Sequence, residues 1–174
     1  MHAAPSSITD QTADPTALPY DPAALVDEYL RILMIPDPDG ARRFVAPDLQ
    51  IRFTGGRPMR DPAECARFNA GRYAWVRKRF EGTELVSGAT QECAVVYNRG
   101  TLYGAWPDGS PFEGNRYVDR YVIRHGLITQ MDVWNDSAER MLARAGLATL
   151  DHLEDAAQPT ESAGPDAGAT GAAS

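Results

Sequence analysis

Large apolar residues recur at helical spacing near the start of the chain and alternate with polar residues through most of its second half. The first pattern predicts a helix over 21–34, with Asp21 as the N-cap and Pro22 at the first helical position. A short helix over 39–45 and a half-buried strand over 49–53 are expected to follow it.

A second long helix is predicted over 61–80, because Asp61-Pro62-Ala63-Glu64 has the spacing of a capping box. One side of this helix would be mostly apolar, with Arg72 near its centre. An arginine on an apolar stripe needs a partner. Arg72 therefore either extends along the edge of the stripe into water or points into a pocket, where it meets a carboxylate or an anionic group of a substrate.

The rest of the chain predicts antiparallel strands and one last helix. Strands are expected over about 83–88, 91–98, 101–106, 112–124 and 127–135, with Gly100 and Pro107-Asp108-Gly109 between them. The last helix would start after Ser137 and stop at Gly146. Helices followed by a run of strands indicate the α+β class.

The last two strands meet at His125-Gly126, and a two-residue turn there would place Asp119 opposite Asp132 on one face of the hairpin. Two opposed carboxyls in apolar surroundings should titrate as a coupled pair with one raised pKa, as in many acid/base sites. Two alternatives stay open. A bulged turn would slip the register by one residue and separate the pair, or Asp119 would join a neighbouring arginine at the surface.

The opposite face of this hairpin would carry Val118, Val122, Met131 and Val133. Such a face is too apolar for simple contact with water. We expect a second subunit to cover it, as in a symmetric homodimer.

The two ends of the chain differ from its middle in composition. Residues 1–20 and 151–174 are rich in Ala, Ser, Thr, Pro and Gly, so we expect disordered tails, the second of them acidic, around one domain over 21–150. The tails hold 7 of the 24 acidic residues and no Lys or Arg, which leaves 17 acids against 17 bases in the domain. A formally neutral domain argues against nucleic-acid binding.

The sequence lacks the residues that several kinds of site require. Cys65 and Cys93 are too few for a zinc cluster or a disulfide framework. Of the three histidines, His2 and His152 lie in or near the predicted tails, which leaves only His125 well inside the domain. No Gly-rich phosphate loop is present, so we expect no cofactor and no metal. The chain shows neither a secretion signal nor an apolar run near the roughly 18 residues that span a bilayer. We expect a cytoplasmic protein that does not bind membranes.

The order of these elements and the run FEGNRYVDRYVIRHGLITQMDVWNDSAERML resemble the nuclear-transport-factor-2-like (NTF2-like) superfamily, in particular its SnoaL-like members, over about residues 22–147. This resemblance implies a cone, in which a curved antiparallel sheet wraps around three helices, and a dimer with a ligand pocket inside each subunit. Within the superfamily the chain also resembles the phenazine-biosynthesis A/B proteins. That similarity matches Asn115 to a shared Asn, Arg72 and Trp75 to a His and a Trp of the third helix, and Asp132 to a catalytic Glu. Arg72 in place of His removes a group that exchanges protons near neutral pH.

These observations together predict a cofactor-independent acid/base enzyme that isomerises, cyclises, condenses or dehydrates a small cyclic metabolite. The setting implied by the resemblance is specialised metabolism. Asp132 is the first candidate for the proton carrier, Asp119 would tune it, and Arg72 would bind developing negative charge. The expected pocket walls are Trp75, Tyr97, Tyr103, Trp106, Asn115, Tyr117, Tyr121 and Trp134, although ordinary core packing also explains each aromatic residue.

Two other functions remain open at this point. One is an epoxide hydrolase of the limonene-epoxide type, which uses two Asp and an Arg around a water molecule. The other is a protein that binds a small ligand without catalysis.

Overall fold

The computed structural model describes residues 18–149, so the predicted tails lie almost entirely outside the described residues. Tyr20, which we had assigned to the first tail, is partly buried and packs against the core. The described residues fall into two compact units, and the boundary between them along the chain lies between Ser137 and Ala138.

Helices come before most of the strands, which confirms the α+β class. The first unit contains α1 (Pro22–Met34), α2 (Pro38–Ala41), the 3-10 turn η1 (Arg42–Phe44), β1 (Val45–Phe53), β2 (Pro58–Met59), α3 (Pro62–Ala70), β3 (Trp75–Leu85), β4 (Ala94–Ala105), β5 (Pro111–Arg124) and β6 (Leu127–Asn135). Helix α4 (Ser137–Arg144) follows, and Gly146 with a φ of 73° ends it as predicted.

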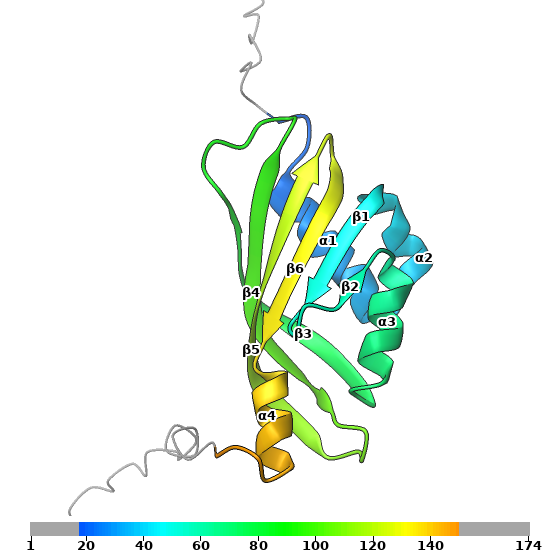
Figure 1. Ribbon diagram of the computed structural model, residues 1–174. Coiled ribbons are helices and arrows are strands. Elements are labelled where there is room, and N and C mark those ends of the chain that lie inside the picture. Colours follow the sequence, from blue (N-terminus) through cyan, green and yellow to red (C-terminus); the bar gives the residue numbers. More distant parts are fainter. Residues whose placement is uncertain (1–17, 150–174) are drawn as a thin grey trace, which may run out of the picture. The chain divides into compact units, whose positions relative to one another are not determined.

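The strands form one six-stranded sheet in the order β2-β1-β6-β5-β4-β3 (Figure 1). Strand β3 is antiparallel to β4, β4 to β5 and β5 to β6, and β2 is antiparallel to β1. Strands β1 and β6, in contrast, run parallel to each other. The sheet is therefore mixed, and the expectation of a wholly antiparallel sheet is wrong. No hairpin joins β1 to β6, because they are the first and last strands of the sheet along the chain, and so no local turn sets their relative direction.

Helix α1 covers one face of the sheet, which we call the inner face. The Asp21 carboxylate accepts hydrogen bonds from the backbone N–H groups of Ala23 and Ala24, at 2.9 and 3.2 Å, so the helix begins where the sequence predicts. The helix lies behind the sheet in the view of Figure 1 and packs against β3 and β4. Its buried Tyr29 meets Tyr121 of β5 edge to face, with ring centroids 6.2 Å apart.

Helix α3 is shorter than predicted. It begins with Asp61 as its N-cap, as expected, but it ends at Ala70 with Gly71 as the C-cap. The residues beyond are in strand β3, which pairs with β4 along its length. Pairing with a neighbouring strand outweighs the helical spacing of the apolar residues, because strand preference depends mainly on cross-strand contacts. The predicted helix over 71–80 is therefore wrong.

Strand β4 runs without a break through Gly100, where we had predicted a boundary. A Cβ atom at Gly100 would overlap the backbone carbonyl oxygen of Arg79. The register of β3 on β4 also shifts between Phe80 and Gly82. Gly100 thus lets the two strands approach each other closely beside a bulge.

The hairpin of β5 and β6 turns at His125 and Gly126 as predicted, and both residues have positive φ, 49° and 78°. Ile123 still pairs with Ile128, but Val122 pairs with Gln130, so the bulge leaves one extra residue in β6. Every later side chain of β6 is thereby moved to the other face.

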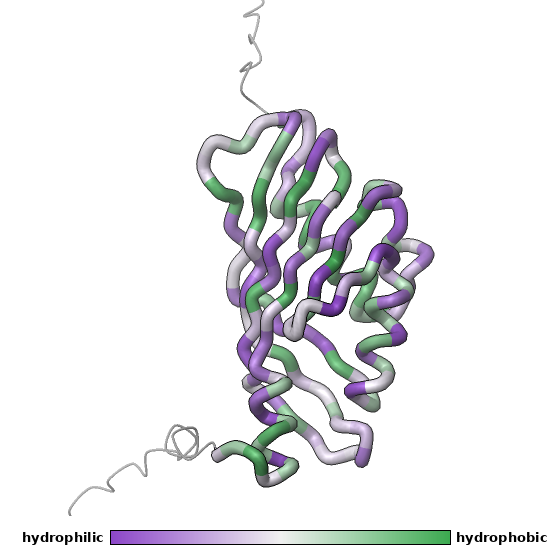
Figure 2. Tube along the Cα trace, viewed as in Figure 1, coloured by the Kyte–Doolittle hydropathy of each residue, from purple (hydrophilic) through white to green (hydrophobic). Residues whose placement is uncertain are grey.

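As a result Asp119 pairs with Val133, and Asp132 pairs with Arg120. The predicted opposition of the two aspartates is wrong, and they lie on different faces of the sheet. Met131 and Val133, which we had placed on the outer face, belong to the buried core cluster. Figure 2 shows hydrophilic and hydrophobic residues in turn along these strands, as expected when one face packs on a core.

Candidate active site

A cavity of about 350 Å³ opens on the inner face of the first unit, between the sheet and helices α1 and α3. This volume lies in the range of small-molecule sites. Most of its walls are apolar, and they include Leu30, Leu33, Phe53, Leu102, Met131 and Val133. The polar side chains that reach it include Lys78 of β3 and Asp119 of β5.

Lys78 and Asp119 form a salt bridge at the cavity wall. The Asp119 side chain is fully buried and that of Lys78 is 16% exposed. The two residues come from strands that β4 separates, so the Lys78 side chain reaches across β4. Its Nζ lies 3.7 Å from the ring centroid of Tyr117, a cation–π contact that balances part of the lost hydration.

The two carboxylate oxygens of Asp119 have different surroundings. Oδ2 takes part in the salt bridge and accepts a hydrogen bond from the hydroxyl group of Tyr121 at 3.1 Å. Oδ1 is buried and has no hydrogen-bond partner within the described part of the chain. A buried acceptor without a partner is uncommon and is costly to stability. Asp119 thus keeps one unsatisfied hydrogen-bond acceptor and is among the residues that line the cavity.

Burial changes the acidity of both members of the salt bridge. Loss of water raises the pKa of the Asp119 carboxyl and lowers the pKa of the Lys78 ammonium group, and their mutual attraction opposes both shifts. The free-energy difference between the ion pair and the neutral pair, an amine beside a carboxylic acid, is therefore smaller here than it is in water.

Other ionisable groups around this pair stay protonated near neutral pH. Burial raises the pKa of the Cys65 thiol of α3 to about 12, and it also raises the pKa values of Tyr29, Tyr117 and Tyr121. The nearby negative charge of Asp119 contributes to each of these shifts. Burial thus moves the pKa values of Lys78 and Asp119 towards neutral pH, whereas it moves those of the thiol and the three phenols away from it.

A buried polar network holds the Tyr117 ring beside Lys78. The Tyr117 hydroxyl donates to Oδ1 of Asn98 at 2.6 Å. The Asn98 amide in turn donates to Thr83 at 2.8 Å and to Asp27 at 3.2 Å. Asn98 is fully buried on β4. This network fixes the wall on which the ammonium group rests.

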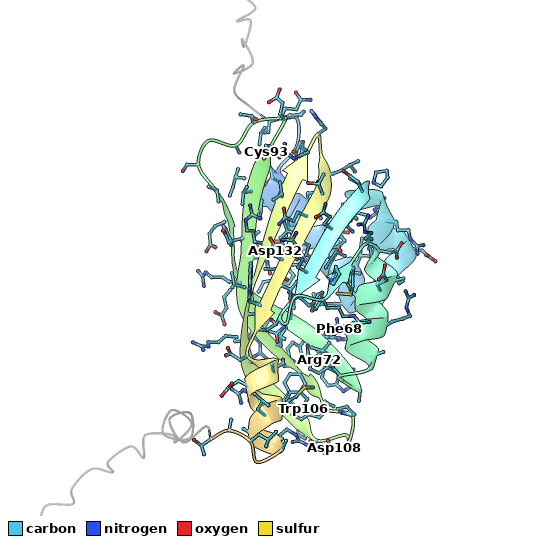
Figure 3. All side chains as sticks on the ribbon, viewed as in Figure 1. Phe68, Arg72, Cys93, Trp106, Asp108 and Asp132 are labelled. Carbon is cyan, nitrogen blue, oxygen red and sulfur yellow. The ribbon has the colours of Figure 1, made fainter. Side chains whose placement is uncertain are left out.

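Asp132 does not reach the cavity. It lies on β6 (Figure 3), and the strand register places it on the face away from Asp119. There it forms a salt bridge of 3.1 Å with Arg120 and accepts a hydrogen bond of 2.8 Å from Gln130. Asp132, the first candidate for the proton carrier, and Asp119, the second, are therefore not brought together. The bulge in β6, which shifts its register by one residue, is the reason.

Arg72 is not on a helix, because α3 has ended before it (Figure 3). Its guanidinium carbon lies 5.0 Å from the ring centroid of Phe68, and Arg72 is not among the residues that line the cavity. We had placed Arg72 at the centre of an apolar helix face, and no helix extends to this residue in the structure.

The predicted pocket walls divide into three groups. Tyr117 and Trp75 line the cavity. Tyr121, Asn115 and Trp106 are buried in the unit, where Tyr121 bonds to Asp119, Asn115 bonds to Ser137 and Trp106 stacks on Tyr73. Tyr97, Tyr103 and Trp134 do not line the cavity, and Trp134 is 47% exposed.

Our sequence analysis missed Lys78, although the chain carries a clear signal for it. Lys78 is the single lysine among the 17 basic residues, and the other 16 are arginines. Because we had placed residue 78 on a long helix, we did not consider which side of a strand it would occupy.

Within residues 18–149, no three His, Cys, Asp or Glu side chains lie close enough together to hold a metal ion. Across the same residues, no helix has the length and apolar character needed to cross a bilayer.

An α+β protein with this sheet order, these preceding helices and this internal cavity has the NTF2-like fold. An NTF2-like protein of unknown function from Burkholderia pseudomallei has a TM-score of 0.56 at 18% identity, over 69% of this chain and 93% of that one. TerC, co-crystallised with polyporic acid, has a TM-score of 0.53 at 16% identity over 68% and 93%. A candidate polyketide cyclase from Silicibacter sp. TM1040 has a TM-score of 0.52 at 13% identity over 68% and 90%. No protein-family model and no curated protein sequence matches the chain.

Proposed function

We propose that this protein is a cofactor-independent acid/base enzyme acting on a small, mostly apolar, cyclic carbonyl compound. The observation that carries the proposal is the salt bridge of Lys78 and Asp119 in the wall of an apolar cavity. Pairs of titratable groups whose pKa values are shifted by burial in a cavity are typical of proton-transfer sites.

In this proposal Asp119 takes the role that we had expected of Asp132. The unpartnered Oδ1 of Asp119 accepts a proton from the carbon next to the substrate carbonyl. The Lys78 ammonium group, 3.7 Å from the Tyr117 ring centroid, stabilises the negative charge that develops on the carbonyl oxygen. Isomerisation, cyclisation, condensation and dehydration all begin with such a proton transfer.

Two further parts of the proposal rest on likeness to other proteins. TerC was crystallised with polyporic acid, and a candidate polyketide cyclase shares the fold, which favours a small molecule of specialised metabolism as substrate. Phenazine chemistry is not included, since Arg72 and Asp132, two of the four residues that carried that similarity, do not line the cavity.

An epoxide hydrolase receives less support from the geometry. That mechanism needs two carboxylates and an arginine around one water molecule, whereas Asp119 is the one carboxylate among the residues that line the described cavity. Ligand binding without catalysis would remain the function if no proton transfer is found.

Proton transfer can be measured before the natural substrate is known. Incubation of 2-tetralone with the protein in D₂O, followed by proton NMR, reports the exchange of hydrogens next to the carbonyl. We expect the wild type to accelerate this exchange and Asp119→Asn to lose about 100- to 10,000-fold of the acceleration.

Asp132→Asn is the matched control, because it makes the same chemical change on the other face of the sheet. We expect it to keep wild-type exchange. Undiminished exchange in Asp119→Asn would refute the proposal, and so would an equal loss of exchange in both variants. Thermal melting of each variant shows whether the fold is retained.

A further inference from the structure

The cavity contains the only lysine of the 174-residue chain. All other basic side chains are arginines, which stay charged under all ordinary conditions, whereas an amine becomes a nucleophile when it loses its proton. Charge pairing with Asp119 alone does not require a lysine, because arginine pairs with carboxylates at least as well.

We infer that Lys78 forms a Schiff base with the carbonyl carbon of an apolar ketone or aldehyde in the cavity, with Asp119 as its proton partner. This inference deepens the proposed function, and it rests on the same cavity. It identifies the substrate class as carbonyl compounds that react covalently, and it gives Lys78 a bond-forming role in addition to an electrostatic one.

Burial lowers the pKa of Lys78 and so shifts it towards the free amine. Its side chain is 16% exposed and Asp119 is fully buried, so the ion pair has lost most of its hydration. Transfer of the proton from Nζ to the carboxylate leaves two neutral groups in an apolar wall. Lysines activated in apolar pockets are an established basis for Schiff-base chemistry.

The reaction balances with groups that the cavity supplies. The neutral amine of Lys78 attacks the carbonyl carbon, and the resulting carbinolamine loses its oxygen as water. That water takes one hydrogen from the amine and one proton from the carboxylic acid of Asp119, which leaves a protonated imine beside a carboxylate. The Asp119 carboxylate can then remove a proton from the adjacent carbon to give an enamine. Hydrolysis by water reverses the sequence and releases the product.

The charge distribution around Lys78 also fits the imine. A protonated imine carries its positive charge at the nitrogen, where the ammonium charge was. The Asp119 carboxylate and the face of the Tyr117 ring, 3.7 Å from Nζ, therefore remain paired with a cation through the reaction. No new charge is left without a partner in the cavity wall.

Reductive trapping tests the inference directly. The full-length protein is incubated with 2-naphthaldehyde and sodium cyanoborohydride near neutral pH, and intact mass spectrometry is followed by peptide mapping. We expect one adduct on Lys78, with a gain equal to the mass of the aldehyde less one oxygen atom. Peptide mapping separates this adduct from modification of the N-terminal amine.

Two variants give the controls. Lys78→Arg keeps the charge and removes the nucleophile, so the internal adduct should disappear. The double variant Lys78→Arg/Arg79→Lys moves the lysine to a neighbouring exposed position on the outer side of β3. We expect Lys78 in the wild type to react at least tenfold faster than this exposed lysine, because each unit of pKa lowering yields about tenfold more free amine.

Absence of an adduct on Lys78, or a rate no higher than that of the exposed lysine, would overturn the inference. The proposed function fails on a different result, namely undiminished proton exchange in Asp119→Asn. If Asp119→Asn loses proton exchange and Lys78→Arg keeps it, the acid/base enzyme is supported and the Schiff base is excluded. Trapping at Lys78 without any exchange would support the covalent site and exclude the acid/base enzyme.

Discussion

At the scale of single residues, the salt bridge of Lys78 and Asp119 is costly to maintain. Both groups lose water on folding, and a buried ion pair seldom stabilises a fold more than apolar side chains of similar volume would. The Tyr121 hydroxyl and the Tyr117 ring compensate for part of that loss, while Oδ1 of Asp119 stays without a partner. A feature with this cost is more readily understood as part of a reactive site than as a support for the fold.

The pH dependence of stability should reveal this pair. In Lys78→Met the attraction that lowers the pKa of Asp119 is lost, so burial raises that pKa further. The native state then keeps a proton that the unfolded state has already released, so the free energy of unfolding falls as pH rises from about 4 to neutral. We expect Lys78→Met to be about 3–5 kcal/mol less stable than the wild type near neutral pH and to recover much of this loss at acid pH.

The double variant Lys78→Met/Asp119→Asn has no charge left at the site. Its stability relative to the wild type should change little over the same pH range and should exceed that of Lys78→Met at neutral pH. Urea denaturation at each pH measures these differences. A loss in Lys78→Met that is equal at acid and neutral pH would contradict the assignment of Asp119 as the buried partner.

At the scale of the elements, two irregularities in the sheet affect where Lys78 and Asp119 lie. The bulge near Thr129 in β6 turns Asp132 to the outer face and leaves Asp119 facing the cavity. The bulge in β3 and the close approach at Gly100 bend β3 against β4. Strand β3 can therefore present Lys78 to a carboxylate two strands away.

Gly100→Ala should destabilise the protein, because the added methyl group would overlap the carbonyl oxygen of Arg79. We expect a loss of about 1–3 kcal/mol in the free energy of unfolding. Gly71→Ala is the matched control, since a methyl group there would make only ordinary contacts at 3.6 Å and beyond and the residue has a φ of −80°. Chemical denaturation compares the two variants, and equal stability of both would show that β3 and β4 are not in close contact at Gly100.

At the scale of the whole molecule, the outer face of the sheet keeps exposed apolar side chains. Val118 is 38% exposed and Trp134 is 47% exposed, and the two residues are directly paired between β5 and β6. The homodimer stays a prediction. Its interface would contain Val118 and Trp134, and not Met131 and Val133 as we had expected.

Trp134→Glu should weaken such a dimer, because two buried carboxylates would face a symmetric apolar interface. We expect the variant to sediment as a monomer at a concentration at which the wild type sediments as a dimer. Ile35→Glu is the control, since Ile35 is 68% exposed and lies at the end of α1, away from the strands of the outer face. A wild type that is monomeric at high concentration would show that this face has no symmetric partner.

Local signals in the sequence were sufficient for much of the fold. The caps at Asp21 and Asp61, the turn at His125-Gly126 and the stop at Gly146 all occur where predicted, because each depends on a few neighbouring residues. Asp119 was singled out for its expected opposition to Asp132, which the bulge in β6 removes, so only its place on the inner face was predicted correctly. The end of α3 and the start of β3 could not be found in this way, because pairing with β4 decides them.

The sequence by itself determined the α+β class, most of the element boundaries and the presence of a carboxyl group on the inner face. Only the tertiary structure decided which residues meet there. A bulge of one residue changes the face of every side chain beyond it, and the contact of Lys78 with Asp119 joins strands that are separated by another strand and by about 40 positions in the chain. Such long-range contacts depend on the pairing and the bulges of the whole sheet, and no local pattern of residues encodes them.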